Sequence, residues 1–243
     1  MFIIVFLIIL SVLVIVHELG HYLVARYFGV RVDEFGLGYP PRLKSLFKYK
    51  GTLFTLNALP IGGFVKIAGE NPNAEEALTP DSFASKNHAQ QIAILAGGVI
   101  FNLIFALVLL LISYGLSAGA QNMLVWTRET FLGLGQFFIQ LVAGEASLES
   151  VSGPVGMVAL TREVVNYGWR GVFDFTALIS INLAIINLLP IPALDGGRIL
   201  FALIESATRR KVPPTVFNII NNLSFLALII LMVVVTIHDV SGL

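Results

Sequence analysis

The first apolar stretch of the chain contains a pair of histidines, and this feature constrains the fold more than any other. Residues 1–16 carry no charge and one polar side chain, Ser11, before the stretch continues into His17-Glu18-Leu19-Gly20-His21. Residues four apart in a helix share a face, so His17 and His21 can point at one ion. Ionisable side chains inside a membrane span are costly and are therefore candidates for a functional site.

The H-E-x-x-H pattern favours a zinc site. Two neutral imidazoles suit Zn²⁺, and a catalytic zinc site takes three protein ligands plus a water. Glu18 follows the first histidine and is placed to take a proton from that water. The alternative is two histidines satisfied by hydrogen bonds within a helix bundle, but that arrangement gives no reason for the glutamate between them.

Composition favours a membrane protein and limits its partners. The 243 residues are 56% hydrophobic and 12% charged, with a mean hydropathy of +0.86, far from that of a soluble globular domain. Fifteen basic and fifteen acidic residues cancel, so no nucleic acid partner is expected. The absence of cysteine excludes disulfides and thiolate ligands, which leaves His, Asp and Glu for a metal.

Four apolar stretches predict an all-α polytopic membrane protein with four transmembrane helices and a small β-sheet or hairpin region after the first helix. Each stretch reaches the roughly 20 residues that cross a hydrocarbon core. The predicted spans are residues 1–26, 91–119, 172–190 and 215–237, with β structure in 30–70 and an amphipathic segment at 123–143. The first span lacks a basic n-region and a cleavage site, so it is interpreted as a retained span. Residues 1–243 are interpreted as a single membrane domain.

Basic residues predict the orientation of these spans. Twelve of them lie in stretches 26–91 and 191–214, against three in 116–171. The first two stretches are therefore expected in the cytosol, and both termini outside it. Four basic residues of the second stretch are expected to meet lipid headgroups, namely Arg198, Arg209, Arg210 and Lys211.

Depth in the membrane points to a third metal ligand. His17 lies sixteen steps, or roughly 24 Å of helix, from Met1, and Asn187 lies fifteen steps, about 22 Å, from Val172. The chain after Asn187 is therefore expected at nearly the depth of His17, and its first acidic residue is Asp195. A carboxylate there can complete a His-His-Asp site. The alternative is a plain N-cap for the following helix, and the two roles are compatible.

These motifs resemble those of the site-2 protease family, which are intramembrane zinc metalloproteases. The resemblance rests on His17-Glu18-Leu19-Gly20-His21 together with Asn187-Leu-Leu-Pro-Ile-Pro-Ala-Leu-Asp195-Gly-Gly. Three further stretches resemble the bacterial branch that cleaves membrane-bound anti-sigma factors and signal-peptide remnants. They are Gly62-Gly63-Phe64-Val65-Lys66, Ser152-Gly153-Pro154-Val155-Gly156 and Asn182-Leu-Ala-Ile-Ile-Asn187.

The resemblance implies zinc ligands at His17, His21 and Asp195, with Glu18 as the catalytic base and Asn187 in contact with the substrate backbone. It implies a zinc endopeptidase that hydrolyses a peptide bond within or near the transmembrane segment of single-span membrane proteins. The expected location is the bacterial inner (cytoplasmic) membrane, with the site toward the cytosolic side and the lipid bilayer as a partner.

The resemblance also implies a membrane-associated β-sheet beside the site. A substrate helix must be unwound before it can be cut, and a strand edge can take up its freed backbone groups. That edge is expected in Phe35–Gly38 or Thr52–Lys66, so four glycines are candidate substrate contacts: Gly36, Gly38, Gly62 and Gly63. The alternative is a cytosolic loop that only covers the site.

The chain departs from this branch in two places. Members usually carry one or two PDZ domains between the second and third spans, but Tyr114 is followed within a few residues by Met123-Leu-Val-Trp. No room remains for such a domain, so this is a natural minimal member or a chain from which the PDZ was removed. The usual Ala-Gly-Pro motif reads Ala96-Gly97-Gly98, which carries over packing only, including Asn102. Two other functions stay open, an inactive relative that binds membrane helices and a zinc transporter.

Overall fold

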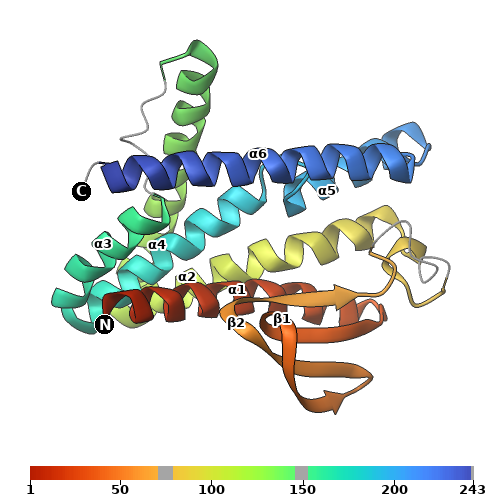
Figure 1. Ribbon diagram of the computed structural model, residues 1–243, viewed down its shortest axis with the longest axis horizontal. Helices are drawn as coiled ribbons and strands as arrows, with labels where there is room; N and C mark the ends of the chain where they lie inside the picture. Colours follow the sequence, from red (N-terminus) through yellow and green to blue (C-terminus); the bar gives the residue numbers. More distant parts are fainter. Residues whose placement is uncertain (71–78, 146–152, 242–243) are drawn as a thin grey trace.

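A computed structural model of the protein describes residues 1–70, 79–145 and 153–241. Helices dominate the described chain, beside one small antiparallel sheet (Figure 1). Four of these helices are long and apolar enough to cross a membrane, over Phe2–Tyr27, His88–Gln140, Gly168–Asn187 and Pro214–Ser241. The mostly helical class and the four candidate spans agree with the sequence prediction.

Helix α1 (Phe2–Tyr27) carries the two histidines. Its Ile, Leu, Val and Phe side chains suit a hydrocarbon environment, and the helix satisfies its own backbone hydrogen bonds. Arg26 stands in the last turn, where a cation is favoured at the negative end of the helix. Gly29, with a φ of 69°, then turns the chain into the sheet.

Helix α2 (His88–Ala143) has two limbs that meet at Gly115, where φ is 79° and ψ is 177°. The predicted second span therefore breaks four residues before its expected end, and the predicted amphipathic segment lies in the second limb. A Cβ on Gly119 would lie 2.7 Å from the carbonyl oxygen of Leu110, which shows how closely the two limbs approach after the kink. Met123 packs on the same cluster as Leu110.

Strands β1 (Val32–Tyr49) and β2 (Thr52–Ile67) form the sheet. Phe35 pairs with both Phe54 and Val65, and Gly36 pairs with both Thr55 and Phe64. The first part of β1 therefore lies between the two halves of β2. The register gives residues 63–67 of β2 partners from β1 only, so this segment is an edge of the sheet.

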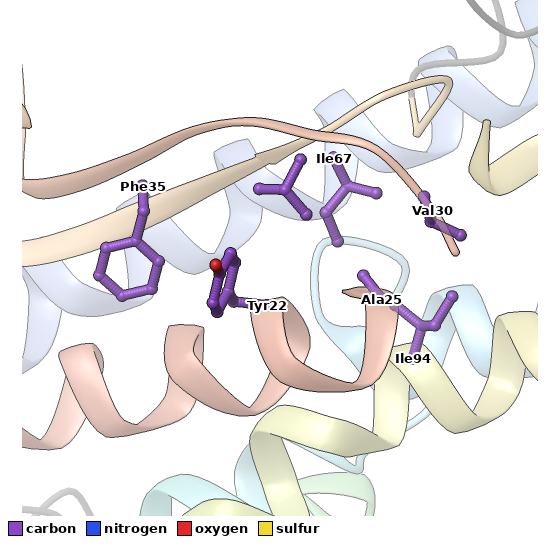
Figure 2. Packing of buried hydrophobic residues seen from close by; sticks show 7 residues of the cluster. Tyr22, Ala25, Val30, Phe35, Ile67 and Ile94 are labelled. Carbon is purple, nitrogen blue, oxygen red and sulfur yellow. The ribbon is translucent and has the colours of Figure 1, made fainter. Parts of the chain in front are cut away.

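A buried cluster fixes the sheet on α1 (Figure 2). Tyr22 of α1 contacts Phe35 of β1 edge to face, with ring centroids 5.7 Å apart. Full burial of an apolar side chain of this kind contributes about 1.5–3 kcal/mol. The other members of the cluster are Ala25, Val30, Val32, Ile67 and Ile94. Because Tyr22 directly follows His21, this packing also sets the position of the sheet relative to the histidines.

The remaining helices are α3 (Pro154–Asn166), α4 (Gly168–Asn187), α5 (Asp195–Thr208) and α6 (Pro214–Ser241). The carboxylate of Asp239 in α6 accepts hydrogen bonds from the N–H groups of Gly153 and Gly156, at 3.2 and 2.8 Å, and so caps α3. Ser152 of this glycine motif lies outside the described residues. The start of α1 and the end of α6 lie at the same end of the molecule (Figure 1).

Candidate metal centre

The imidazoles of His17 and His21 meet on the buried face of α1. Their Nε2 atoms are 3.1 Å apart, and their ring centroids are 4.7 Å apart at an interplanar angle of 84°. Both side chains are buried. The spacing of four residues therefore produces the shared face that the sequence predicted.

The chain after α4 delivers Asp195 to the same point. Helix α4 ends at Asn187, because Pro190 and Pro192 cannot continue it. Helix α5 then begins at Asp195, whose Oδ2 lies 3.0 Å from His17 Nε2 and 3.3 Å from His21 Nε2. The N-cap of α5 is Leu194, so Asp195 is the first helical residue rather than the cap. A carboxylate in this first turn is favoured by the positive end of the helix.

The three donor atoms fit one zinc ion. All three lie within 4.8 Å of one another and could hold a metal ion. Ligands about 2.0–2.1 Å from a tetrahedral zinc stand about 3.3 Å from each other, close to the separations just given. Asp195 Oδ2 is buried, and among the described residues its polar neighbours are the two imidazole nitrogens. A buried anionic oxygen of this kind needs a cation or a donor.

The tautomer of His21 also fits a metal. Its Nδ1 lies 2.9 Å from the carbonyl oxygen of Ile94 in α2. A carbonyl oxygen only accepts, so Nδ1 carries the proton, and the neutral imidazole then presents a lone pair at Nε2. Metal-bound histidines are usually oriented by such a hydrogen bond from the second ring nitrogen.

Gly98 of α2 packs directly against both imidazoles. A Cβ at this position would lie 2.5 Å from His21 Nε2 and 2.6 Å from His17 Cε1. The backbones of α2 and α1 are also close one residue earlier. A Cβ on Gly97 would lie 2.7 Å from the carbonyl oxygen of Gly20. Sequence analysis assigned only a packing role to Ala96-Gly97-Gly98. In the structure this stretch also brings α2 into contact with the two histidine side chains.

Glu18 faces the sheet beside the histidine pair. Its Oε2 accepts a hydrogen bond of 3.0 Å from the backbone N–H of Val65 in β2. Burial, and to a smaller extent the charge of Glu18, raise the pKa of the nearby Tyr39 in β1. The carboxylate therefore lies between the donor atoms of α1 and the edge strand of the sheet.

Arg198 ties the helix of Asp195 to the chain after β2. Its guanidinium forms an ion pair with the Glu70 carboxylate, donates to the Glu70 carbonyl oxygen at 3.2 Å, and lies 5.8 Å from the centre of the Phe83 ring. The expectation of a headgroup anchor is wrong for Arg198, because its charge is used inside the protein. Sequence offered no signal for this pair, which joins residues 128 apart.

The other predicted site residues take varied positions. Asn187 is half-buried at the end of α4, and its side chain has no hydrogen-bond partner within the described residues. Gly36 lies inside the sheet, where a Cβ would lie 2.8 Å from Asn57 Nδ2. Gly63 lies at the edge, close to Ile15 of α1. Gly38 and Gly62 have φ values of 79° and 75°, which explains glycine there by backbone conformation alone.

The fold and the site define a membrane metalloprotein in which two histidines of a candidate spanning helix meet an aspartate at the start of α5. The model of Peptidase family M50 matches residues 5–238, so the chain belongs to that family. A relative from Clostridium acetobutylicum that bears a zinc metalloprotease name is 29% identical over 95% of this chain and 94% of its own length. That alignment runs over 324 positions, so the relative has residues without a counterpart here.

Relatives named zinc metalloprotease RasP match a shorter part of the chain. The one from Geobacillus kaustophilus is 43% identical over 47% of this chain and 26% of its own length. The one from Oceanobacillus iheyensis is 42% identical over 48% of this chain and 28% of its own length. The protein is therefore a zinc metalloprotease of the site-2 protease family.

Proposed function

We propose that this metalloprotease hydrolyses a peptide bond within or near the transmembrane segment of single-span membrane proteins, as in regulated intramembrane proteolysis. His17, His21 and Asp195 would hold the zinc. The observation that carries the proposal is the convergence of these three donors, 3.0–3.3 Å apart, on a face of an apolar helix long enough to cross a membrane. The substrate class that we propose is the anti-sigma-factor or signal-peptide-remnant type.

The groups at the site have separate roles in the proposed hydrolysis. Zinc, when bound, supplies Lewis-acid activation of a water and of a carbonyl group. The Glu18 carboxylate accepts a proton from the water that attacks the scissile carbonyl carbon and then donates it to the leaving amine as the C–N bond breaks. Asn187 contacts the substrate backbone and fixes its register, because its side-chain amide at the end of α4 is not engaged by any described residue.

The edge of the sheet receives the unwound substrate. Phe35 and Gly36 are paired on both sides, so an added strand finds its place along residues 63–67 of β2 instead. The Val65 N–H in this segment donates to Glu18. A substrate carbonyl that takes over this N–H frees the Glu18 carboxylate for proton transfer, so strand addition and activation of the base occur together.

Single cysteines test this docking edge, because the natural chain has none. Lys66→Cys places a thiol on the exposed side of residues 63–67, and Lys48→Cys places a matched thiol on the exposed second part of β1. With Glu18→Gln in both chains to prevent turnover, a substrate with a cysteine beside its scissile bond should cross-link to the first variant only. Equal cross-linking of both variants, or of Lys48→Cys alone, contradicts the assignment of the edge.

The membrane orientation follows from the charge distribution. With stretches 26–91 and 191–214 in the cytosol, both termini are extracytoplasmic and the site lies toward the cytosolic side of a bacterial cytoplasmic membrane. The start of α1 and the end of α6 lie at one end of the molecule, which agrees with this topology (Figure 1). The chain from 1 to 243 then acts as one membrane domain.

Reconstitution tests the function directly. Purified protein in phospholipid vesicles should cut a single-span substrate at a bond within or next to its apolar segment, as located by mass spectrometry of the products. A zinc chelator should stop cleavage, and added zinc should restore it, because the donor set is the only cluster of three metal-ligating groups in the described residues. Cleavage that persists in chelator, or that occurs only in water-exposed peptides, contradicts the proposal.

A further inference from the structure

Asn102 is a fully buried polar residue beside the histidine pair. It lies in the first limb of α2, one turn after Gly98, with an exposed fraction of 0%. Its side-chain nitrogen, Nδ2, lies 3.3 Å from Nδ1 of His17. Its Oδ1 is buried and has no hydrogen-bond partner within the described residues. An amide in a membrane-spanning helix is costly to bury, so this placement needs a reason.

The chemistry of His17 supplies that reason. Its Nε2 faces Asp195 and His21, so a metal there requires a lone pair at Nε2 and the proton at Nδ1. A protonated Nδ1 needs an acceptor, and the amide of Asn102 is the group within reach. Rotation of an amide by half a turn exchanges its oxygen and nitrogen, and the oxygen of Asn102 has no competing donor.

The two imidazoles are then held in the same way. Ile94 and Asn102 lie on the same limb of α2: Ile94 offers its carbonyl oxygen to Nδ1 of His21, and Asn102, after that half-turn, offers its side-chain oxygen to Nδ1 of His17. The backbone of Asn102 is itself fixed, because its carbonyl oxygen accepts a hydrogen bond of 2.8 Å from Ser180 of α4. Helix α4 leads into the segment that ends at Asp195, so Asn102 connects the elements that carry the three donors.

We infer that Asn102 is a positioning residue whose side-chain oxygen accepts a hydrogen bond from the Nδ1–H of His17 and holds the tautomer that presents Nε2 to the metal. This inference rests on the proposed ligand set. Partners of this kind fix the ring orientation of metal-bound histidines, and their loss costs about 10- to 100-fold in metal affinity.

A pair of near-isosteric substitutions tests the role. Asn102→Leu removes the acceptor at nearly constant volume, and Asn102→Asp retains it. Zinc affinity, measured by chelator competition on purified protein, should fall about 10- to 100-fold in Asn102→Leu and stay within a few-fold of wild type in Asn102→Asp. Ser113→Ala removes a buried hydroxyl from the same limb of α2 that has no hydrogen-bond partner within the described residues, so it serves as the control and should keep wild-type affinity. Wild-type affinity in Asn102→Leu, or an equal loss in both Asn102 variants, overturns the inference.

Spectroscopy of the unsubstituted protein gives a second, independent test. Nitrogen NMR of the zinc-loaded protein with ¹⁵N-labelled histidine should show His17 protonated at Nδ1 and bound through Nε2. Binding through Nδ1 overturns the inference even if the Asn102 variants fail to fold. Failure of the proposed ligand set gives a different result, since His17→Ala would then keep wild-type zinc affinity, whereas failure of the proposed proteolysis would show as absent cleavage with zinc still bound.

Discussion

Replacing Glu18 by Gln should stop peptide hydrolysis and leave zinc binding intact. The substitution removes the group proposed to accept the proton, and a positioned base of this kind contributes about 10²- to 10⁴-fold to the rate. The fold at this position should persist, because the side-chain oxygen of Gln can still accept the hydrogen bond from Val65 N–H. The two readouts are kcat on a single-span substrate and zinc bound per protein molecule.

A matched variant separates this effect from a general loss of charge. Glu129→Gln changes an exposed acid on the second limb of α2, where Glu129 pairs only with the neighbouring Arg128 within the described chain. It should keep both kcat and zinc. If Glu18→Gln retains more than about a tenth of wild-type turnover, Glu18 does not have the role of base assigned to it.

The same experiment distinguishes the protease from the other two functions. An inactive relative would show no turnover even with Glu18 in place, and a zinc transporter would show zinc movement across vesicles that does not depend on a peptide substrate. A transporter also favours ionisable side chains along several spans. Within the described residues, one cluster of three metal-ligating groups is present, on α1 and α5, which favours a resident ion.

The sequence predicted the centre of the site because each step used a regular spacing. Residues four apart place His17 and His21 on one face, and a constant rise per residue places the end of α4 at the depth of His17. The structure brings Asp195 to 3.0 Å from His17 Nε2, as the depth argument expects. Helix length and helix periodicity are thus enough to predict that these residues, distant in sequence, lie close together.

The surrounding contacts follow no such spacing. Gly98 and Asn102 of α2 meet the imidazoles through the crossing of two helices, and a crossing point has no local pattern. The ion pair of Arg198 with Glu70 joins α5 to the chain after β2, and no sequence pattern predicts it either. The order of the strands in the sheet was not predictable for a different reason. Alternating side chains predict strands, but they do not determine which strand is central and which lies at the edge. Phe35 turned out to have partners on both sides.

Replacing Gly98 by Ala should lower zinc affinity and kcat together. The added methyl group would lie 2.5 Å from His21 Nε2 and 2.7 Å from His17 Nδ1, closer than side-chain carbons approach. Helix α2 cannot retreat freely, because retreat opens the contact of Gly97 with the backbone of Gly20 and moves Ile94 away from His21. The imidazoles must therefore shift, and a displacement of 1 Å in a catalytic group costs about 10²-fold in rate.

The control for this prediction lies on the same helix. Gly133 is exposed on the second limb of α2, and a Cβ there has no atom within 4 Å. Gly133→Ala should keep zinc content, kcat and thermal stability, and it should gain slightly from better helix propensity. If Gly98→Ala also keeps both zinc and kcat, then α2 does not hold the imidazoles in place. The close approach at Gly98 would then be a feature of helix packing alone, and Asn102 would lose the rigid support that its role requires.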